Sequence, residues 1–214
     1  MPHASEATRL FLVTPPRVDA GAFPSRLAAA LSGGNVAAVL IALDGVPDTP
    51  SIAEALISIA QNARAAALVA DDIDFAERLA ADGVQIGTGL ADLRRAVARF
   101  RPQRSVGAGD LRSRHAAMEA GEAGADYVFF GRPHGDTREE PHPAALELAE
   151  WWSALMQVPA VVMAGSSLTS VERAAATGAA FVALHDAVWR HEHGPAEAIR
   201  LANALVARAG RQAA

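Results

Sequence analysis

The sequence predicts a (β/α)8 TIM barrel that forms a single domain over residues 1–214. Short apolar runs alternate strictly with longer, alanine-rich segments of helical period, and eight such strand–helix units follow one another from about residue 9 to residue 208. The runs are apolar throughout, as expected of parallel strands buried on both faces. A doubly wound open sheet is the alternative, but the first strand lacks the G-x-G-x-x-G turn of that fold, and eight even units favour closure.

Each expected strand is a short apolar run, and we place the strands at residues 9–13, 36–43, 66–70, 84–86, 105–107, 127–130, 160–163 and 181–184. Helices are expected at residues 23–31, 49–62, 73–81, 90–100, 113–123, 143–155, 168–177 and 195–208. Gly124 and Gly178 precede two strands, where a helix end needs a residue that tolerates left-handed backbone angles. Thr169 and Glu172 match a capping box at the start of the seventh helix.

The composition excludes several classes of protein. The chain has 19 basic residues, all of them arginine, against 24 acidic residues, and its net charge of −5 predicts no nucleic-acid partner. Because lysine and cysteine are both missing, the chain cannot form a Schiff base, a Walker-type phosphate loop, a thiolate or a disulfide. The first residues do not resemble a signal peptide and no apolar stretch reaches about 18 residues, so we expect no membrane partner and a cytoplasmic location.

Polar side chains gather at the carboxyl ends of the expected strands, where TIM barrels carry their active sites. The densest stretch is the loop after the sixth strand, residues 131–140. The candidate site residues at these strand ends are Asp71, Gln85, Thr88, Gly131, Arg132, His134, Thr137, Arg138, Gly165, Ser166, Ser167, His185 and Asp186.

Several of these candidates also fit purely structural roles. Asp71 or Asp72 could cap the helix after the third strand. Gln85 lies within a strand, where a buried hydrogen bond would account for its amide. Residues 166–167 precede a helix whose N–H groups could hold a phosphate, and a plain helix start explains them equally well. Residues 185–186 are charged at the buried end of a strand and need partners, which favours a place in the site.

Segments at several strand ends resemble those of one known family. Residues 10–14 read L-F-L-V-T, residues 83–87 read G-V-Q-I-G, residues 124–131 read G-A-D-Y-V-F-F-G and residues 164–166 read A-G-S. In this order, and over nearly the whole chain, they resemble the thiamine phosphate synthase family, which includes a thiazole tautomerase branch. The resemblance implies a TIM barrel that joins an aminopyrimidine diphosphate to a thiazole phosphate with Mg²⁺ and releases pyrophosphate. Members of the tautomerase branch instead aromatise the thiazole phosphate.

The resemblance also implies roles for the candidate residues. Asp71 corresponds to a Mg²⁺-binding aspartate, and residues 136–139 correspond to a T-x-T-K phosphate loop in which Arg138 replaces the lysine. The residues that we expect to be catalytic are Arg132, His134, Arg138, His185 and Asp186. Those that we expect to bind substrate are Gln85, Thr88, Gly131, Thr137, Gly165, Ser166 and Ser167.

The sequence departs from the family where phosphate is held. The Q-x-R-x-K motif after the second strand falls on residues 40–44, L-I-A-L-D, and Leu90 stands where a second metal-binding aspartate is expected. Asp186 replaces a serine that helps to bind the thiazole phosphate, and Arg112 replaces the histidine of the tautomerases. A carboxylate beside a phosphate costs about 4 kcal/mol at 4 Å and an effective dielectric constant near 20. These exchanges predict an eroded phosphate site and place the synthase activity in doubt. Arginines can replace part of the lost positive charge, because they bind phosphate through two hydrogen bonds.

We therefore expect a thiamine phosphate synthase-like protein of thiamine biosynthesis with a small-molecule ligand, a weakened Mg²⁺ site and a homo-oligomeric state. A non-catalytic barrel is one alternative, because a mouth rich in aspartate would prefer a cation or an amine. A metal-dependent enzyme of changed chemistry is another. Its ion would lie among Asp71, Asp72, His134, His185 and Asp186.

Overall fold

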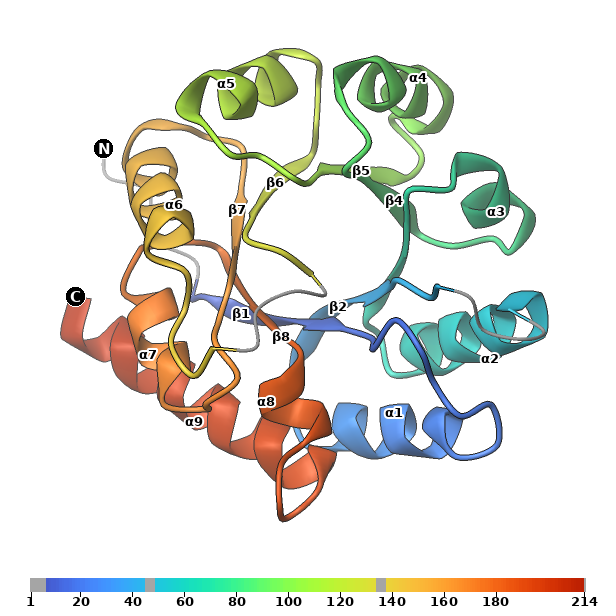
Figure 1. The fold of residues 1–214 in the computed structure, drawn as a ribbon, viewed down its shortest axis with the longest axis vertical. Helices are drawn as coiled ribbons and strands as arrows, with labels where there is room; N and C mark the ends of the chain where they lie inside the picture. Colours follow the sequence, from blue (N-terminus) through green and yellow to red (C-terminus); the bar gives the residue numbers. More distant parts are fainter. Residues whose placement is uncertain (1–6, 45–48, 134–137, 214) are drawn as a thin grey trace.

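The computed structural model describes residues 7–44, 49–133 and 138–213 of the chain. Within them, eight parallel strands close into a barrel in the order β1 to β8, and β1 pairs with β8. Helices surround the barrel on its outside (Figure 1). The predicted (β/α)8 TIM barrel is therefore confirmed.

The strands lie close to their expected positions. They are β1 (Arg9–Val13), β2 (Val36–Ile41), β3 (Ala66–Ala70), β4 (Gly83–Ile86), β5 (Ser105–Ala108), β6 (Tyr127–Phe130), β7 (Ala160–Met163) and β8 (Phe181–Leu184). The helices are α1 (Phe23–Ser32), α2 (Thr49–Asn62), α3 (Ile73–Arg78), α4 (Leu90–Phe100), α5 (Arg114–Glu122), α6 (Pro143–Leu155), α7 (Ser170–Ala175), α8 (Asp186–Trp189) and α9 (Pro195–Ala213).

The start of the seventh helix differs from the expectation, and the capping box predicted there is wrong. Thr169 makes no capping hydrogen bond with its side chain, because its hydroxyl oxygen lies 2.8 Å from Ser167 Oγ. Glu172 forms an ion pair with Arg208 of α9. Helix α7 therefore begins only at Ser170. The short helix α8 was not predicted, because four residues are too few to show a helical period.

Apolar side chains fill the barrel on both sides of the strands. Inside the barrel, aromatic and aliphatic residues from β1, β2, β3, β6, β7 and β8 form one buried cluster, which includes Phe11, Leu40 and Phe129. A larger cluster lies between the strands and the helices. The barrel is thus a packed core and no pore, so ligands reach only its two ends.

Two aspartates bind backbone N–H groups at the amino-terminal end of the barrel. The carboxylate of Asp82 accepts the N–H of Ala67 at 2.8 Å, and that of Asp126 accepts the N–H of Val106 at 2.8 Å. Gly124 lies just before this turn at φ +93°, as its position in the sequence predicted. The aspartate of the G-A-D-Y-V segment is therefore structural, since it ties β6 to β5.

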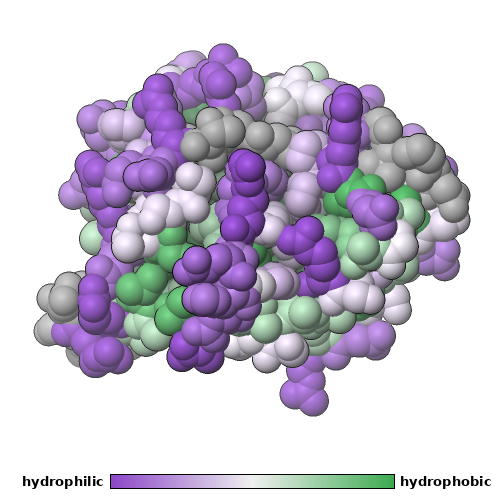
Figure 2. Space-filling model, turned by 60° about the horizontal axis from the view of Figure 1, so that its bottom comes forward, coloured by the Kyte–Doolittle hydropathy of each residue, from purple (hydrophilic) through white to green (hydrophobic). Residues whose placement is uncertain are grey.

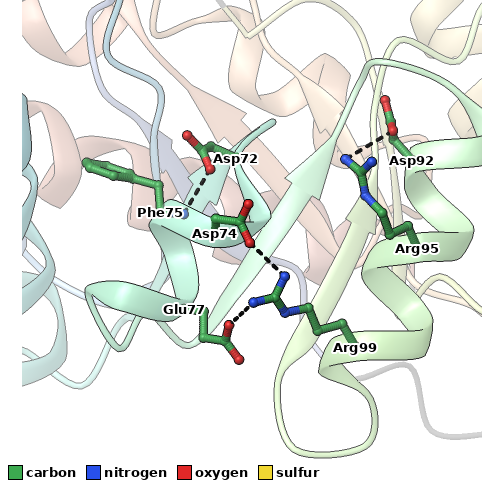
Figure 3. Close-up of polar contacts among 7 residues, drawn as sticks. All are labelled: Asp72, Asp74, Phe75, Glu77, Asp92, Arg95 and Arg99. Atoms are coloured by element: carbon green, nitrogen blue, oxygen red, sulfur yellow. Dashed lines mark hydrogen bonds and ion pairs between the residues drawn. The ribbon is translucent and has the colours of Figure 1, made fainter.

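The helical shell is joined by surface ion pairs. Arg99 of α4 pairs with both Asp74 and Glu77 of α3, and the Asp72 carboxylate caps α3 by accepting the Phe75 N–H at 2.8 Å (Figure 3). Figure 2 shows one face of the molecule, on which hydrophilic side chains lie between smaller hydrophobic areas. No helix in the described part of the chain is both long and apolar enough to span a membrane.

Candidate functional site

The interior of the barrel ends in a buried polar pair below the strand ends. Tyr127 of β6 donates its hydroxyl hydrogen to Gln85 Oε1 of β4 at 3.1 Å, and both side chains are buried. Burial, helped by the charge of Asp126, raises the pKa of Tyr127 well above its usual range. A Cβ at Gly107 would lie 2.0 Å from the Tyr127 ring, so this position requires glycine. The pair is uncharged and lies inside the barrel beneath the strand ends. The buried hydrogen bond expected for Gln85 is present.

A cleft at the carboxyl ends of β5 and β6 is the strongest candidate for a ligand site. Its volume is about 440 Å³, within the range of small-molecule sites. Residues from the β5–α5 loop, the loop after β6 and the first turns of α6 line the cleft, and they include both polar and apolar side chains. The lining residues are Asp110, Leu111, Arg112, Gly131, Arg132, Arg138, His142, Ala144, Ala145 and Leu148.

Arginine gives this cleft its chemical character. Arg112, Arg132 and Arg138 line it, and Asp110 is its single acidic lining residue. Guanidinium groups are always charged and bind phosphate through two parallel hydrogen bonds. The cleft is therefore suited to a small anion with several oxygen atoms.

Tertiary contacts hold the backbone that carries two of the arginines. Gly131 turns the chain at φ +111°, and a Cβ there would lie 2.5 Å from Met163 Cβ, so Arg132 follows a turn that only glycine allows. The carbonyl oxygen of Arg138 accepts the N–H of Ser166 at 2.7 Å, which joins the loop after β6 to the loop after β7.

The third arginine forms an ion pair at the surface, with the side chains of Arg112 and Asp110 73% and 48% exposed. Arg112 donates its Nε–H to Asp110 Oδ1 at 2.9 Å. Asp110 itself lies at φ +52°, a left-handed conformation that costs free energy for any residue other than glycine. The sequence placed Asp110 and Arg112 after the fifth strand, at the mouth of the barrel, but assigned them no catalytic or substrate-binding role, and His142 was missed altogether. The sequence offers only one indication for these three residues, which is that Asp110 and Arg112 follow a strand and His142 precedes a helix.

The two aspartates after β3 have different roles. Asp72 caps α3, whereas Asp71 lies at φ +58° and its Oδ1 accepts the N–H of Gly87 at 2.5 Å. A Cβ at Gly87 would lie 3.6 Å from Asp71 Oδ1 and 3.8 Å from Asp110 Cβ, so these two acids flank Gly87. Thr88 lies just beyond, in a smaller neighbouring hollow of about 290 Å³.

The ends of β7 and β8 have their own hydrogen bonds. Gly165, Ser166 and Ser167 donate their N–H groups to Ser170 Oγ, the Arg138 carbonyl and the Glu139 carbonyl, at 2.9, 2.7 and 3.2 Å. His185 Nδ1 lies 3.1 Å from Asp186 Oδ1, with the two side chains 12% and 18% exposed. The sequence predicted that His185 and Asp186 need partners at this strand end, and the structure shows the two side chains next to each other.

The structure brings together part of the predicted set. Gly131, Arg132 and Arg138 share the cleft, while Gln85 lies beneath the strand ends and Asp71 and Thr88 lie beside the cleft. His134 and Thr137 lie outside the described residues. Within the described ranges, no three histidine, aspartate or glutamate side chains form a group that could hold a metal ion.

A second hollow, of about 350 Å³, lies at the opposite end of the barrel. Its lining includes Asp82 and Asp126, whose carboxylates already bind backbone N–H groups, together with Arg104. The amino-terminal end of a TIM barrel contributes stability, and its active sites lie at the other end. The arginine cleft is therefore the candidate site.

The fold and the cleft define a TIM-barrel protein whose strand ends suit a small anionic molecule. Within this class, the chain belongs to the thiamine monophosphate synthase family, whose sequence model matches residues 10–188. It is 40% identical over 206 residues to a thiamine-phosphate synthase of Hyphomonas neptunium, which covers 92% of this chain and 93% of that protein. It is 39% identical over 195 residues to the thiamine-phosphate synthase of Rhodospirillum centenum, with 89% and 94% covered.

A solved structure has the same fold. The thiamine phosphate pyrophosphorylase from Pyrococcus furiosus superposes with a TM-score of 0.76 over 94% of this chain and 96% of its own, at 24% sequence identity. The family model and the relatives at 40% and 39% identity confirm the family resemblance predicted from the strand-end motifs.

Proposed function

We propose that this chain joins an aminopyrimidine diphosphate to a thiazole in thiamine biosynthesis, with the diphosphate held in the arginine cleft. The observation that carries the proposal is the convergence of Arg112, Arg132 and Arg138 on one cleft at the strand ends. Relatives at 40% and 39% identity are named thiamine-phosphate synthases, which supports the same activity. The sequence alone predicted an eroded phosphate site. That prediction did not count Arg112 as a phosphate-binding cation.

The arginines would act on the leaving group. When the bond between the pyrimidine methylene carbon and the diphosphate oxygen breaks, the electron pair leaves with diphosphate and negative charge grows on its oxygen atoms. Guanidinium groups stabilise that growing charge through their own positive charge and through paired hydrogen bonds to the oxygen atoms. Gly131 lets the backbone approach the ligand, and Arg138 is held through its carbonyl by the Ser166 N–H.

Mg²⁺ is implied by the family, and Asp71 is the residue that we propose as its ligand. Mg²⁺ is usually held by one or two carboxylates together with substrate phosphates and water, so a single aspartate fits such a site. One oxygen of Asp71 accepts the Gly87 N–H, and a carboxylate oxygen pair has room for a further partner. When bound, the ion neutralises charge on the diphosphate.

The two alternatives drawn from the sequence have less support. An amine-binding barrel needs carboxylates that face the ligand, yet Asp72 caps α3 and Asp110 pairs with Arg112. Asp186 likewise pairs with His185. A metal enzyme of changed chemistry needs several ligands in one group, and the described residues offer no such group.

The test is product formation from both precursors with Mg²⁺, read after oxidation to a fluorescent thiochrome. We expect turnover, and we expect Arg132→Ala and Arg138→Ala each to lower kcat/KM by about tenfold or more, because each removes a donor to the leaving group. Inorganic pyrophosphate should raise the Tm of the wild-type protein and raise it less in these variants.

The matched control is Arg95→Ala, which removes an exposed arginine of α4 that pairs with Asp92 outside the cleft. It should keep the wild-type kcat/KM and the full pyrophosphate effect. Absence of product beside a working synthase, together with no effect of pyrophosphate on Tm, would refute the proposed function.

Three broader statements belong to the same proposal. We take residues 1–214 as one domain, because the barrel closes only when β1 pairs with β8. A cytoplasmic location and small-molecule partners agree with the net charge of −5 and with the family. The homo-oligomeric state rests on the resemblance alone.

A further inference from the structure

A row of three residues crosses the inside of the barrel from β4 to β6. Gln85 of β4 pairs in register with Gly107 of β5, and Gly107 pairs with Tyr127 of β6. Because the middle residue is glycine, the Tyr127 ring has the space to reach across β5 to Gln85. Both polar side chains are buried, with exposed fractions of 4% for Gln85 and 7% for Tyr127. The row therefore holds a polar pair in one fixed place beneath the mouth of the barrel.

The hydrogen bond in this row sets the orientation of the Gln85 amide. A buried phenol hydroxyl needs an acceptor, and the acceptor that the described residues give Tyr127 is Gln85 Oε1 at 3.1 Å. The side-chain carbonyl of Gln85 therefore faces Tyr127. The amide nitrogen Nε2 carries two N–H groups and accepts no hydrogen bond, and it faces away from the phenol. Gln85 thus offers only hydrogen-bond donors on its other side.

Two glycines stand above the donor side of Gln85. Side chains alternate between the two faces of a strand, so Gly87 and Gly109 follow Gln85 and Gly107 on the inner face, one layer nearer the mouth. A Cβ at Gly109 would lie 3.2 Å from Gln85 Nε2, which places the amide nitrogen next to this glycine. Neither glycine has a side chain that could cover the amide. Gln85 Nε2 has no acceptor among the described residues and is not fully buried, so a ligand at the mouth can reach it.

The glycines also connect Gln85 with the candidate site. Gly87 and Gly109 both line the hollow of about 290 Å³ beside the arginine cleft. Asp110 and Leu111 line the hollow and the cleft alike, so the two spaces adjoin. A molecule that places its diphosphate among the arginines has its remaining part next to these glycines. A flat ring suits a place where two successive strand ends carry no side chain.

We propose that Gln85 recognises the aminopyrimidine by donating an Nε2–H group to a ring nitrogen, and that Tyr127 is the positioning residue that holds the amide in this orientation. The inference rests on the proposed function and specifies how its first substrate is recognised. Pyrimidine ring nitrogens accept hydrogen bonds, whereas the thiazole nitrogen needs its lone pair for the new carbon–nitrogen bond. Gln85 therefore selects a pyrimidine over a ring of the same shape that has only C–H groups.

The experiment compares two ligands that carry no phosphate, so that the ring alone is tested. One is the unphosphorylated aminopyrimidine alcohol, and the other is its carbon analogue, in which C–H groups replace both ring nitrogens. Calorimetry gives the Kd of each, and the measured quantity is the ratio of the two Kd values. We expect the wild-type protein to bind the pyrimidine at least about tenfold more tightly, because the carbon analogue leaves a desolvated N–H group without an acceptor.

Two variants test the two residues. Gln85→Met keeps the length of the side chain and removes its donors, so the ratio of the two Kd values should fall to about one. Tyr127→Phe removes the partner that orients the amide. If the amide then occupies its two orientations equally, half of the molecules present the donor and the preference for the pyrimidine should fall about twofold.

Thr177→Val is the matched control, because it removes a buried hydroxyl group before β8, at the opposite end of the barrel. Thr177 Oγ1 donates to the Ala174 carbonyl at 2.7 Å, and the residue is 9% exposed. This variant should lose stability, as the Gln85 and Tyr127 variants do, and should keep the wild-type ratio. A merely structural role of Gln85 and Tyr127 would lower the Tm of their variants and leave the ratio unchanged.

Three results would overturn the inference. They are a wild-type ratio near one, no binding of the pyrimidine alcohol to the wild-type protein, and a ratio that Gln85→Met does not change. The Tm shift caused by inorganic pyrophosphate, which has no ring, separates these results from the proposed function. If pyrophosphate stabilises the protein and product forms but the ratio is near one, the inference is wrong and the proposed function stands. If neither is found, the proposed function is wrong and the inference falls with it.

Discussion

Among single residues, Tyr127 has the most unusual environment. It is the one tyrosine of the chain, it is buried, and its hydroxyl hydrogen goes to Gln85. The chain also lacks lysine and cysteine. Tyr127 is therefore the sole side chain whose ordinary pKa lies between about 8 and 12, and alkaline titration of this protein reports on one buried phenol.

We predict that stability falls above about pH 10 because of Tyr127. Burial raises the pKa of Tyr127 in the folded protein above its ordinary value of 10.0. Above that pH the unfolded chain releases the phenol proton and the folded protein keeps it, so the folded state binds more protons and the free energy of unfolding decreases. The slope should approach about 1.4 kcal/mol per pH unit in urea titrations.

The variant Tyr127→Phe should remove this slope. At neutral pH it should destabilise the protein by about 1–3 kcal/mol, because it leaves the buried Gln85 oxygen without its donor. Phenolate absorbance in the wild-type protein should appear only as the protein unfolds. Phenolate absorbance near pH 10 in a protein that is still folded would show that the phenol is not protected.

At the scale of elements, the turn at the end of β6 shapes the candidate site. Gly131 lies at φ +111° against Met163, and it leads the chain out of β6 toward Arg132. The signal for this glycine in the sequence was a family motif. The structure supplies the physical reason, which is the lack of space for a Cβ at a turn with positive φ.

We predict opposite effects of the same substitution at two glycines. Gly131→Ala should destabilise the protein by more than about 1 kcal/mol, since it adds a strained backbone to a steric overlap. Gly210→Ala lies in α9, where a Cβ meets no atom within 4 Å, and should stabilise it by up to about 1 kcal/mol. Urea unfolding of both variants checks this, and equal effects would contradict it.

At the scale of the whole molecule, closure of the barrel joins the two ends of the sequence. Strand β1 lies between β2 and β8, and its residues pair with partners on both sides. Loss of either terminal strand would leave the backbone groups of its neighbours unpaired around an opened core. Each strand of the closed barrel needs the strand on either side of it to complete its backbone hydrogen bonds.

The chain should therefore unfold as one cooperative unit. We expect a single calorimetric transition whose calorimetric and van't Hoff enthalpies agree. Far-ultraviolet circular dichroism and tryptophan fluorescence should follow the same curve. Two separate transitions would contradict both the single cooperative unit and the single domain proposed for residues 1–214.

The sequence by itself determined the strand–helix alternation, the closed barrel and the family. These properties depend on local patterns, such as apolar runs, helical periods and the G-A-D-Y-V segment, and local patterns are readable one segment at a time. It also placed Gly131, Arg132 and Arg138 at one strand end.

Only the tertiary structure decided which polar residues meet and which are already occupied. Arg112 joins the other two arginines because the carboxyl ends of β5 and β6 are neighbours in the barrel. The N–H of Ser166 donates to the carbonyl of Arg138, 28 residues earlier in the chain, which the sequence could not show. Hydrogen bonds and charge clusters of this kind join distant segments, so no local pattern in the sequence contains them.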